Sequence, residues 1–211
     1  MNATVTPEFV RTSTDSVVQL DRVRWETYGD LRDSPENDHV RMTFDRGVLV
    51  LMSPSKRHER IASLIGQLIV EWALVKRVPF QSCDTVTFQR KDLSRALEPD
   101  KCYYIQHEKI VRDRDELDLN VDPPPDLVIE VDVASSSARK LELYAAFGVP
   151  EVWHWQHDRL QVLILRDSQY EPANDSDALS GFPNRQAVDL IVDRRNRDDM
   201  TLLLEFRNLI Q

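Results

Sequence analysis

The sequence has little glycine and no long apolar segment. Five glycines among 211 residues, together with a charged fraction of 30%, exclude a fibrous or low-complexity chain. No apolar run approaches the roughly 18 residues that span a bilayer, so we expect no membrane-spanning helix and no membrane partner. The first twenty residues, MNATVTPEFVRTSTDSVVQL, lack the basic segment and apolar core of a secretory signal. We therefore expect a cytoplasmic protein.

Cysteine is also scarce, and Lys and Arg are fewer than Asp and Glu. The two cysteines, Cys83 and Cys102, show no CxxC or Cys/His spacing, so buried reduced thiols are predicted rather than a disulfide or a zinc site.

The formal net charge of −9 argues against avid, non-specific binding to nucleic acid, because phosphate contacts need clustered Lys and Arg. This charge counts against a nuclease only moderately, since an enzyme can carry a local basic groove.

The chain does contain enough apolar residues for one sizeable core. At 41% apolar over 211 residues, a single domain is expected. Residues 1–20 have no sustained periodicity and are predicted to form a flexible N-terminal arm. The single domain then covers residues 21–211, and its end, residues 186–211, is predicted to be helical.

The clearest predicted helix covers residues 56–77, where apolar residues recur on one stripe at helical spacing. Residues 126–133 form an almost continuous β-branched run, typical of a central strand that is buried on both faces. A second helix is predicted over residues 138–148. Further strands are predicted over 39–55 (a hairpin with Gly47 at its turn), 80–89, 100–106, 151–156 and 159–166, and connections over 107–125 and 170–185. Strands separated by a helix, around a mixed β-sheet flanked by helices, indicate an α/β fold.

Two acids and a lysine stand at the edge of this predicted sheet. Asp100 follows a proline in EPDKCYYI, Glu130 lies within the apolar strand LVIEV, and Lys140 lies in the first turn of the next helix. A buried carboxylate is costly unless it is paired or bound. Two carboxylates can hold Mg²⁺ or Mn²⁺, and a lysine can orient a water or neutralise charge on a phosphate. The alternative is that Glu130 forms a cap or a salt bridge in a partly open strand.

Three stretches together resemble the Uma-two family of restriction-endonuclease-like proteins, within the PD-(D/E)XK nuclease superfamily: PPDLVIEVDVASSSARKLELYAAFGVPEVW, EPDKCYYI and VLVLMSPSKRHERI. The resemblance runs from about Trp25 to Leu165. It implies a restriction-endonuclease-like core in which Asp100 and Glu130 are metal ligands. It also implies that the catalytic lysine has moved from the strand to the following helix, where it is Lys140.

Two further acids are additional candidates for the metal site. Glu59 sits where many superfamily members hold an extra acid, although a solvated glutamate on a helix surface is the more ordinary interpretation. Asp132 stands two residues after Glu130, where the superfamily pattern has its lysine. It is either an extra ligand or a charge that repels the phosphate. Tyr144 lies one turn from Lys140 on the same helix face, in a position to support that lysine.

These observations lead to two hypotheses. The first is a Mg²⁺- or Mn²⁺-dependent endonuclease that hydrolyses phosphodiester bonds in DNA, with Lys101, Arg139 and Lys140 as a positive rim beside the acids. The second is a catalytically inactive protein of the same fold that acts as a protein-interaction or homo-oligomeric module, with the acids retained for stability. A homodimer is expected under the first hypothesis, because many nucleases cut two strands as symmetric pairs.

Overall fold

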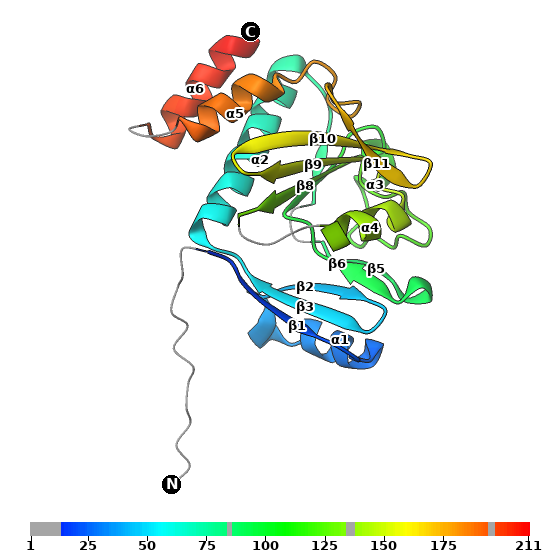
Figure 1. The fold of residues 1–211 in the computed structure, drawn as a ribbon. Coiled ribbons are helices and arrows are strands. Elements are labelled where there is room, and N and C mark those ends of the chain that lie inside the picture. The colour runs from blue at the N-terminus through cyan, green and yellow to red at the C-terminus, as the bar shows by residue number, and fades with distance from the viewer. Residues whose placement is uncertain (1–13, 84–85, 134–137, 194–196) are drawn as a thin grey trace.

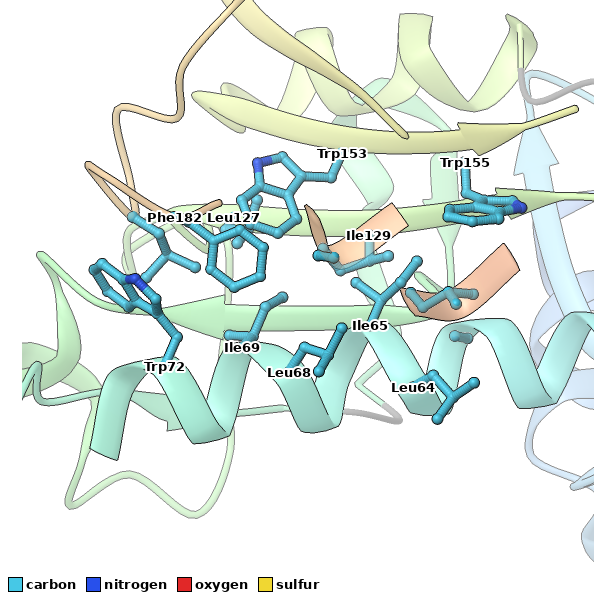
Figure 2. Packing of buried hydrophobic residues seen from close by; sticks show 14 of the residues in the cluster. Leu64, Ile65, Leu68, Ile69, Trp72, Leu127, Ile129, Trp153, Trp155 and Phe182 are labelled. Carbon is cyan, nitrogen blue, oxygen red and sulfur yellow. The ribbon is translucent and has the colours of Figure 1, made fainter. Parts of the chain in front are cut away.

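The computed structural model describes residues 14–83, 86–133, 138–193 and 197–211, and its longest helix is α2 (Lys56–Lys76). Ser55 caps this helix by accepting a hydrogen bond from the backbone N–H of His58 at 3.2 Å. The helix ends where Arg77 takes a left-handed conformation, two residues before Pro79. Its apolar stripe packs on strands of the neighbouring sheet (Figure 2), with Leu64, Ile65, Leu68, Ile69 and Trp72 near Leu127, Ile129, Trp153, Trp155 and Phe182. The predicted helix and its place in the core are confirmed.

The sheet against α2 has six strands and is mixed. Strands β8 and β9 are parallel, and every other neighbouring pair in this sheet is antiparallel. The parallel pair is connected through α4 (Ala138–Phe147), which ends at Gly148 with a positive φ of 76°. The spatial order is β11 (Gln169–Ala173), β10 (Arg159–Arg166), β9 (Glu151–Gln156), β8 (Leu127–Asp132), β7 (Lys101–Tyr104) and β4 (Gln81–Ser82). The predicted α/β fold with a mixed sheet is confirmed.

A second sheet of five strands is antiparallel throughout and lies beside the first (Figure 1). Its hairpin turns at Gly47, whose φ of 92° favours glycine. Helix α1 (Trp25–Arg32) covers this sheet, with Tyr28 stacked on Phe44 at 5.2 Å between ring centroids. The spatial order is β1 (Ser16–Leu20), β3 (Val48–Ser53), β2 (Arg41–Asp45), β6 (Arg95–Leu97) and β5 (Phe88–Arg90).

Helices complete both faces of the six-stranded sheet. At the C-terminal end, α5 (Asn184–Val192) and α6 (Asp199–Ile210) pack beside α2 (Figure 1), as predicted for this segment. On the opposite face, α4 packs on β8 and also contacts β6 of the other sheet. The short helices are η1 (Pro35–Asn37), η2 (Lys91–Leu93) and α3 (Glu108–Val111). None of the described helices is long and apolar enough to cross a membrane.

Several sequence predictions differ from the structure, and one of them is the connection predicted over 107–125, which contains the short helix α3. Residues 16–20 of the predicted arm form β1, because this β-rich segment pairs with the open edge of β3; residues 1–13 lie outside the described residues. The predicted strand over 80–89 is divided between β4 and β5, which belong to different sheets. Part of the predicted connection over 170–185 pairs with β10 as the edge strand β11, where a proline is tolerated. Both cysteines are buried and neither forms a disulfide, as predicted.

Candidate functional site

The pairing of β7 with β8 brings Asp100 and Glu130 together. The antiparallel register sets Lys101 opposite Ile129, and its continuation by one residue sets Asp100 opposite Glu130. Because side chains alternate along a strand, Glu130 shares a face with Val128, which packs in the cluster with α4, whereas Ile129 packs in the cluster with α2. The two acids therefore lie on the α4 side of the sheet.

Asp100 is a buried carboxylate with several donors around it. Its side chain is inaccessible to solvent. Its Oδ2 accepts a hydrogen bond from the backbone N–H of Val131 at 2.7 Å. Its Oδ1 lies 2.9 Å from Nε2 of His58 and also pairs with Nη1 of Arg41. Burial alone would raise the pKa of Asp100, but His58, Lys140 and Arg41 hold that pKa below its ordinary value, so the group is ionised.

Glu130 is equally buried, and two side chains of α4 donate hydrogen bonds to it. Lys140 Nζ donates to Glu130 Oε2 at 2.7 Å, and the Tyr144 hydroxyl donates to Oε1. Burial and the nearby charge of Asp100 raise the pKa of Glu130, against the opposing effect of Lys140. Burial would lower the pKa of Lys140, but the charges of Glu130 and Asp100 raise it. The three predicted site residues therefore meet in one cluster, and Tyr144 supports Glu130 rather than Lys140 itself.

The two additional candidate acids are placed differently. Glu59 is half exposed, and its Oε1 lies 2.7 Å from Nη2 of Arg41, so Arg41 connects it to Asp100. Asp132 is buried on the same face of β8 as Glu130, and its Oδ2 lies 2.8 Å from Nε2 of His154. Glu59 thus borders the cluster, whereas Asp132 is engaged by a histidine of β9.

The predicted positive rim is only partly assembled. Lys140 joins the acids, and Arg139 precedes it on α4. Lys101 points to the other face of the sheet, because it alternates with Asp100. Its side chain lies beside α2, where a methyl group on Gly66 would come 3.7 Å from Cδ of Lys101. One cation that joins Lys140 at the acids is Arg41, which no sequence pattern had indicated.

His58 is a second residue of the cluster that the sequence interpretation missed. It is 1% exposed, and its Nδ1 lies 3.2 Å from Oδ2 of Asp15 while Nε2 faces Asp100. Asp15 also accepts a hydrogen bond from the backbone N–H of Ser55 at 2.7 Å. Burial would lower the pKa of His58, but the contacts with Asp100 and Asp15 raise it to about 9. A signal was present, since His58 lies one turn before Ile61 on the apolar stripe.

A cleft of about 640 Å³ opens beside the cluster. Arg41 and Glu59 line it, so it adjoins the side of Asp100 that Arg41 occupies. Polar and charged residues make up most of its wall. The lining residues are Arg32, Asn37, Asp38, His39, Val40, Arg41, Met42, Pro54, Glu59, Thr87, Glu98 and Pro99. A polar molecule in this cleft would reach the buried acids past the Arg41 side chain.

The carboxylate oxygens of the cluster are ligands of the kind that a hard divalent cation binds. Mg²⁺ commonly binds to one or two carboxylates and keeps several waters, and Asp100 and Glu130 are two carboxylates on adjacent strands. The described residues contain no group of three or more His, Cys, Asp or Glu side chains arranged around a metal position. The carboxylate oxygens of Asp100 and Glu130 all have protein donors. A bound ion would therefore have to replace some of these donors.

The model of the Uma2 family, described as "Putative restriction endonuclease", matches residues 25–190. This range contains Arg41, His58 and all the predicted site residues. No curated protein matches the sequence.

A solved structure with the same fold comes from Anabaena variabilis ATCC 29413, a protein described as a putative nuclease belonging to DUF820. The superposition covers 88% of this chain and 99% of that chain, with a TM-score of 0.52 and 16% sequence identity. At this identity the likeness establishes the fold, and the chemistry has to be argued from the cluster itself.

Proposed function

This chain belongs to the Uma2 family, and from that premise we propose that it is a Mg²⁺-dependent endonuclease that hydrolyses phosphodiester bonds in DNA. One observation carries the proposal: Asp100, Glu130 and Lys140 form a single buried cluster beside a polar cleft. The pKa values of Asp100, Glu130 and Lys140 are all shifted from their ordinary values. Such shifts are frequent among functional groups.

In this proposal Asp100 and Glu130 would hold Mg²⁺ or Mn²⁺. The ion would lower the pKa of a bound water and offset charge on the phosphate. The chain's own residues position these acids: the Val131 N–H and His58 orient Asp100, and the Tyr144 hydroxyl orients Glu130. Preorganised donors of this kind hold the acids in one geometry before the substrate arrives.

Lys140 is the proposed catalytic lysine. It donates a hydrogen bond to Glu130, and the charges of Glu130 and Asp100 raise its pKa despite burial, so it is protonated in this arrangement. A protonated amine in a site shielded from water stabilises negative charge that develops on the phosphate oxygens. This state favours the neutralising role of Lys140 over the alternative in which it removes a proton from the attacking water.

The DNA substrate is proposed from the family and from the cleft. The wall of the cleft contains Arg32 and Arg41 beside the acids Asp38, Glu59 and Glu98, and the chain as a whole has a net charge of −9. Binding would therefore depend on a few local contacts to phosphates and would weaken as salt is added. Cleavage of both DNA strands would take two active sites, so a homodimer is part of the proposal. We also propose that the protein is located in the cytoplasm.

The test combines metal binding with cleavage. Millimolar Mn²⁺ should raise the melting temperature of the wild-type protein, because a ligand that binds only the folded state stabilises it. Asp100→Asn and Glu130→Gln should remove that rise and the cleavage of plasmid DNA. Glu71→Gln is a matched control, since Glu71 is a buried acid that pairs with Arg207 on α6, outside the cluster. An unchanged melting temperature and intact plasmid for the wild type would overturn the proposal.

One observation favours the second hypothesis, a catalytically inactive interaction module. Every carboxylate oxygen of Asp100 and Glu130 has a donor within the protein, so these two carboxylates are satisfied without an ion. Under this hypothesis the acids stabilise the junction of β7, β8 and α4. Glu130→Gln would then lower the melting temperature while Mn²⁺ has no effect on any variant.

A further inference from the structure

Arg41 reaches the candidate site from the other sheet. It begins β2, and its guanidinium bridges two acids: Nη1 pairs with Asp100 Oδ1, and Nη2 lies 2.7 Å from Glu59 Oε1. Nη1 also lies 3.3 Å from the backbone carbonyl of Pro99. A planar guanidinium that spans two carboxylates satisfies both at once. The side chain thus occupies the side of Asp100 that faces the cleft.

The other partners of Asp100 are held in place. The Val131 N–H belongs to the backbone of a central strand. His58 is 1% exposed and is fixed on its far side by Asp15 at 3.2 Å. Arg41 instead has a long side chain that is 21% exposed and lines the cleft. Arg41 is therefore the partner that can leave Asp100 without breaking the strand or the helix around it.

We propose that Arg41 is an exchangeable counter-ion that pairs with Asp100 in the unliganded protein and turns to a substrate phosphodiester when a divalent cation binds Asp100. This inference rests on the proposed function and adds a substrate-binding role for Arg41. The guanidinium and the cation compete for the same carboxylate oxygen. The cleft gives the displaced guanidinium room, and a phosphate is the anion that it binds in two-pronged geometry.

The consequence is that Arg41 opposes metal binding but supports cleavage. Arg41→Gln should bind Mn²⁺ more tightly in the absence of DNA, by about fivefold or more, as is typical of coupled sites. The same variant should lose kcat/KM for DNA cleavage by about 10²-fold, because the phosphate contact is gone. A residue with only a structural role would weaken Mn²⁺ binding and cleavage together. The opposite signs distinguish the two roles.

The experiment measures Mn²⁺ binding to the full chain by isothermal titration calorimetry, without DNA, and cleavage separately. Arg95→Gln is the matched control. Arg95 lies on β6 of the same sheet and pairs with Asp45 at 2.9 Å with 15% exposure, but it does not line the cleft. It should leave Mn²⁺ affinity and cleavage unchanged. Arg41→Lys keeps one charge and cannot bridge both acids, so its Mn²⁺ affinity should fall between those of the wild type and Arg41→Gln.

The outcomes separate this inference from the proposed function. If the wild type binds Mn²⁺ and Arg41→Gln binds it equally or more weakly, the exchange is overturned while the nuclease proposal stands. If Mn²⁺ binds to neither protein and neither cleaves DNA, the proposed function fails and takes the exchange with it. Should Arg41→Gln not fold, as judged by circular dichroism, tighter binding by Arg41→Lys supports the exchange and weaker or equal binding overturns it.

Discussion

Glu130 and Glu151 are both buried acids of the six-stranded sheet, yet they are satisfied in different ways. Glu151, at the start of β9, accepts from Trp153 Nε1 at 2.5 Å, Ser176 Oγ at 2.6 Å, and the backbone N–H groups of Asp177 and Ala178 at 2.9 and 2.8 Å. All four donors are neutral. Glu130 instead has a cation, Lys140, and lies near Asp100 with its own cations.

The difference separates a structural acid from a candidate functional one. The donors of Glu151 come largely from one short segment, so this carboxylate fastens a loop to the sheet. Two of these donors are backbone N–H groups, which cannot be exchanged without unfolding that loop. The cations around Asp100 and Glu130 stand at the ends of side chains, and one of them, Arg41, is 21% exposed and lines the cleft. Burial alone therefore does not identify the site; the kind of donor does.

The largest expected effect is on cleavage by the cluster. Asp100→Asn should slow plasmid cleavage by about 10³-fold, because a metal ligand and the charge it carries are lost. Initial rates at saturating Mn²⁺, on protein confirmed to be folded, provide the measurement. A variant that cleaves at the wild-type rate would remove Asp100 from the site.

The same comparison predicts a loss of stability at Glu151. Glu151→Ala leaves an indole N–H, a hydroxyl and two backbone N–H groups without their acceptor. The free energy of unfolding should fall by about 3 kcal/mol, measured by urea denaturation, while the folded protein still binds Mn²⁺. A loss of Mn²⁺ affinity with unchanged stability would reverse the roles assigned to the two acids.

The raised pKa of His58 predicts a pH dependence of stability. Asp100 and Asp15 favour its protonated form, with a pKa of about 9 against an ordinary value of 6.5. A raised pKa contributes stability that is complete below pH 6.5 and is lost as the pH rises through about 9. The free energy of unfolding should therefore decrease by up to about 3 kcal/mol over this window. For His58→Gln we expect a flatter profile; identical slopes would refute the assignment.

A smaller effect is expected when Glu130 loses its hydroxyl donor. Tyr144→Phe should lower the free energy of unfolding by about 1 kcal/mol and weaken Mn²⁺ binding by about tenfold, as residues that orient metal ligands do. Tyr170→Phe is the matched control, because its hydroxyl donates to the carbonyl of Val149 at 2.7 Å. Calorimetric titration compares the two, and equal Mn²⁺ affinities would leave Tyr144 a purely structural role.

The smallest effect is expected at Glu59. It is half exposed and makes a single ion pair with Arg41. Glu59→Gln should change the free energy of unfolding by less than about 1 kcal/mol and leave cleavage near the wild-type rate. A loss of cleavage as large as that of Asp100→Asn would instead place Glu59 among the metal ligands.

Much of the fold was predictable from local patterns. The 56–77 helix, the strand over 126–133 and the hairpin around Gly47 follow from periodicity and turn residues, and the structure has them. The second sheet was not predicted, because the partition of residues 80–89 between two sheets depends on which strands lie nearby. Edge strands such as β1 and β11 were missed for the same reason: their pairing energy comes from partners distant in the chain.

The residues of the site likewise divide into those that the sequence indicated and those that it did not. Glu130 was predictable because it interrupts an apolar strand, whereas Asp100 and Lys140 were indicated mainly by the resemblance to the Uma-two family. Arg41 was not, since it is 59 residues from Asp100 in the chain and lies on a strand of the other sheet. Asp15, which holds His58 from the far side, is 43 residues from it. No local pattern encodes such distant ion pairs.

Hydrophobic periodicity, turn chemistry and an acid within an apolar strand are local properties. For this reason the order of residues alone predicted an α/β chain with Glu130 in a buried central strand. Which charges surround Asp100 and Glu130 was decided by the packing of two sheets and α2, because Coulomb interactions depend on distance in space and not on separation along the chain.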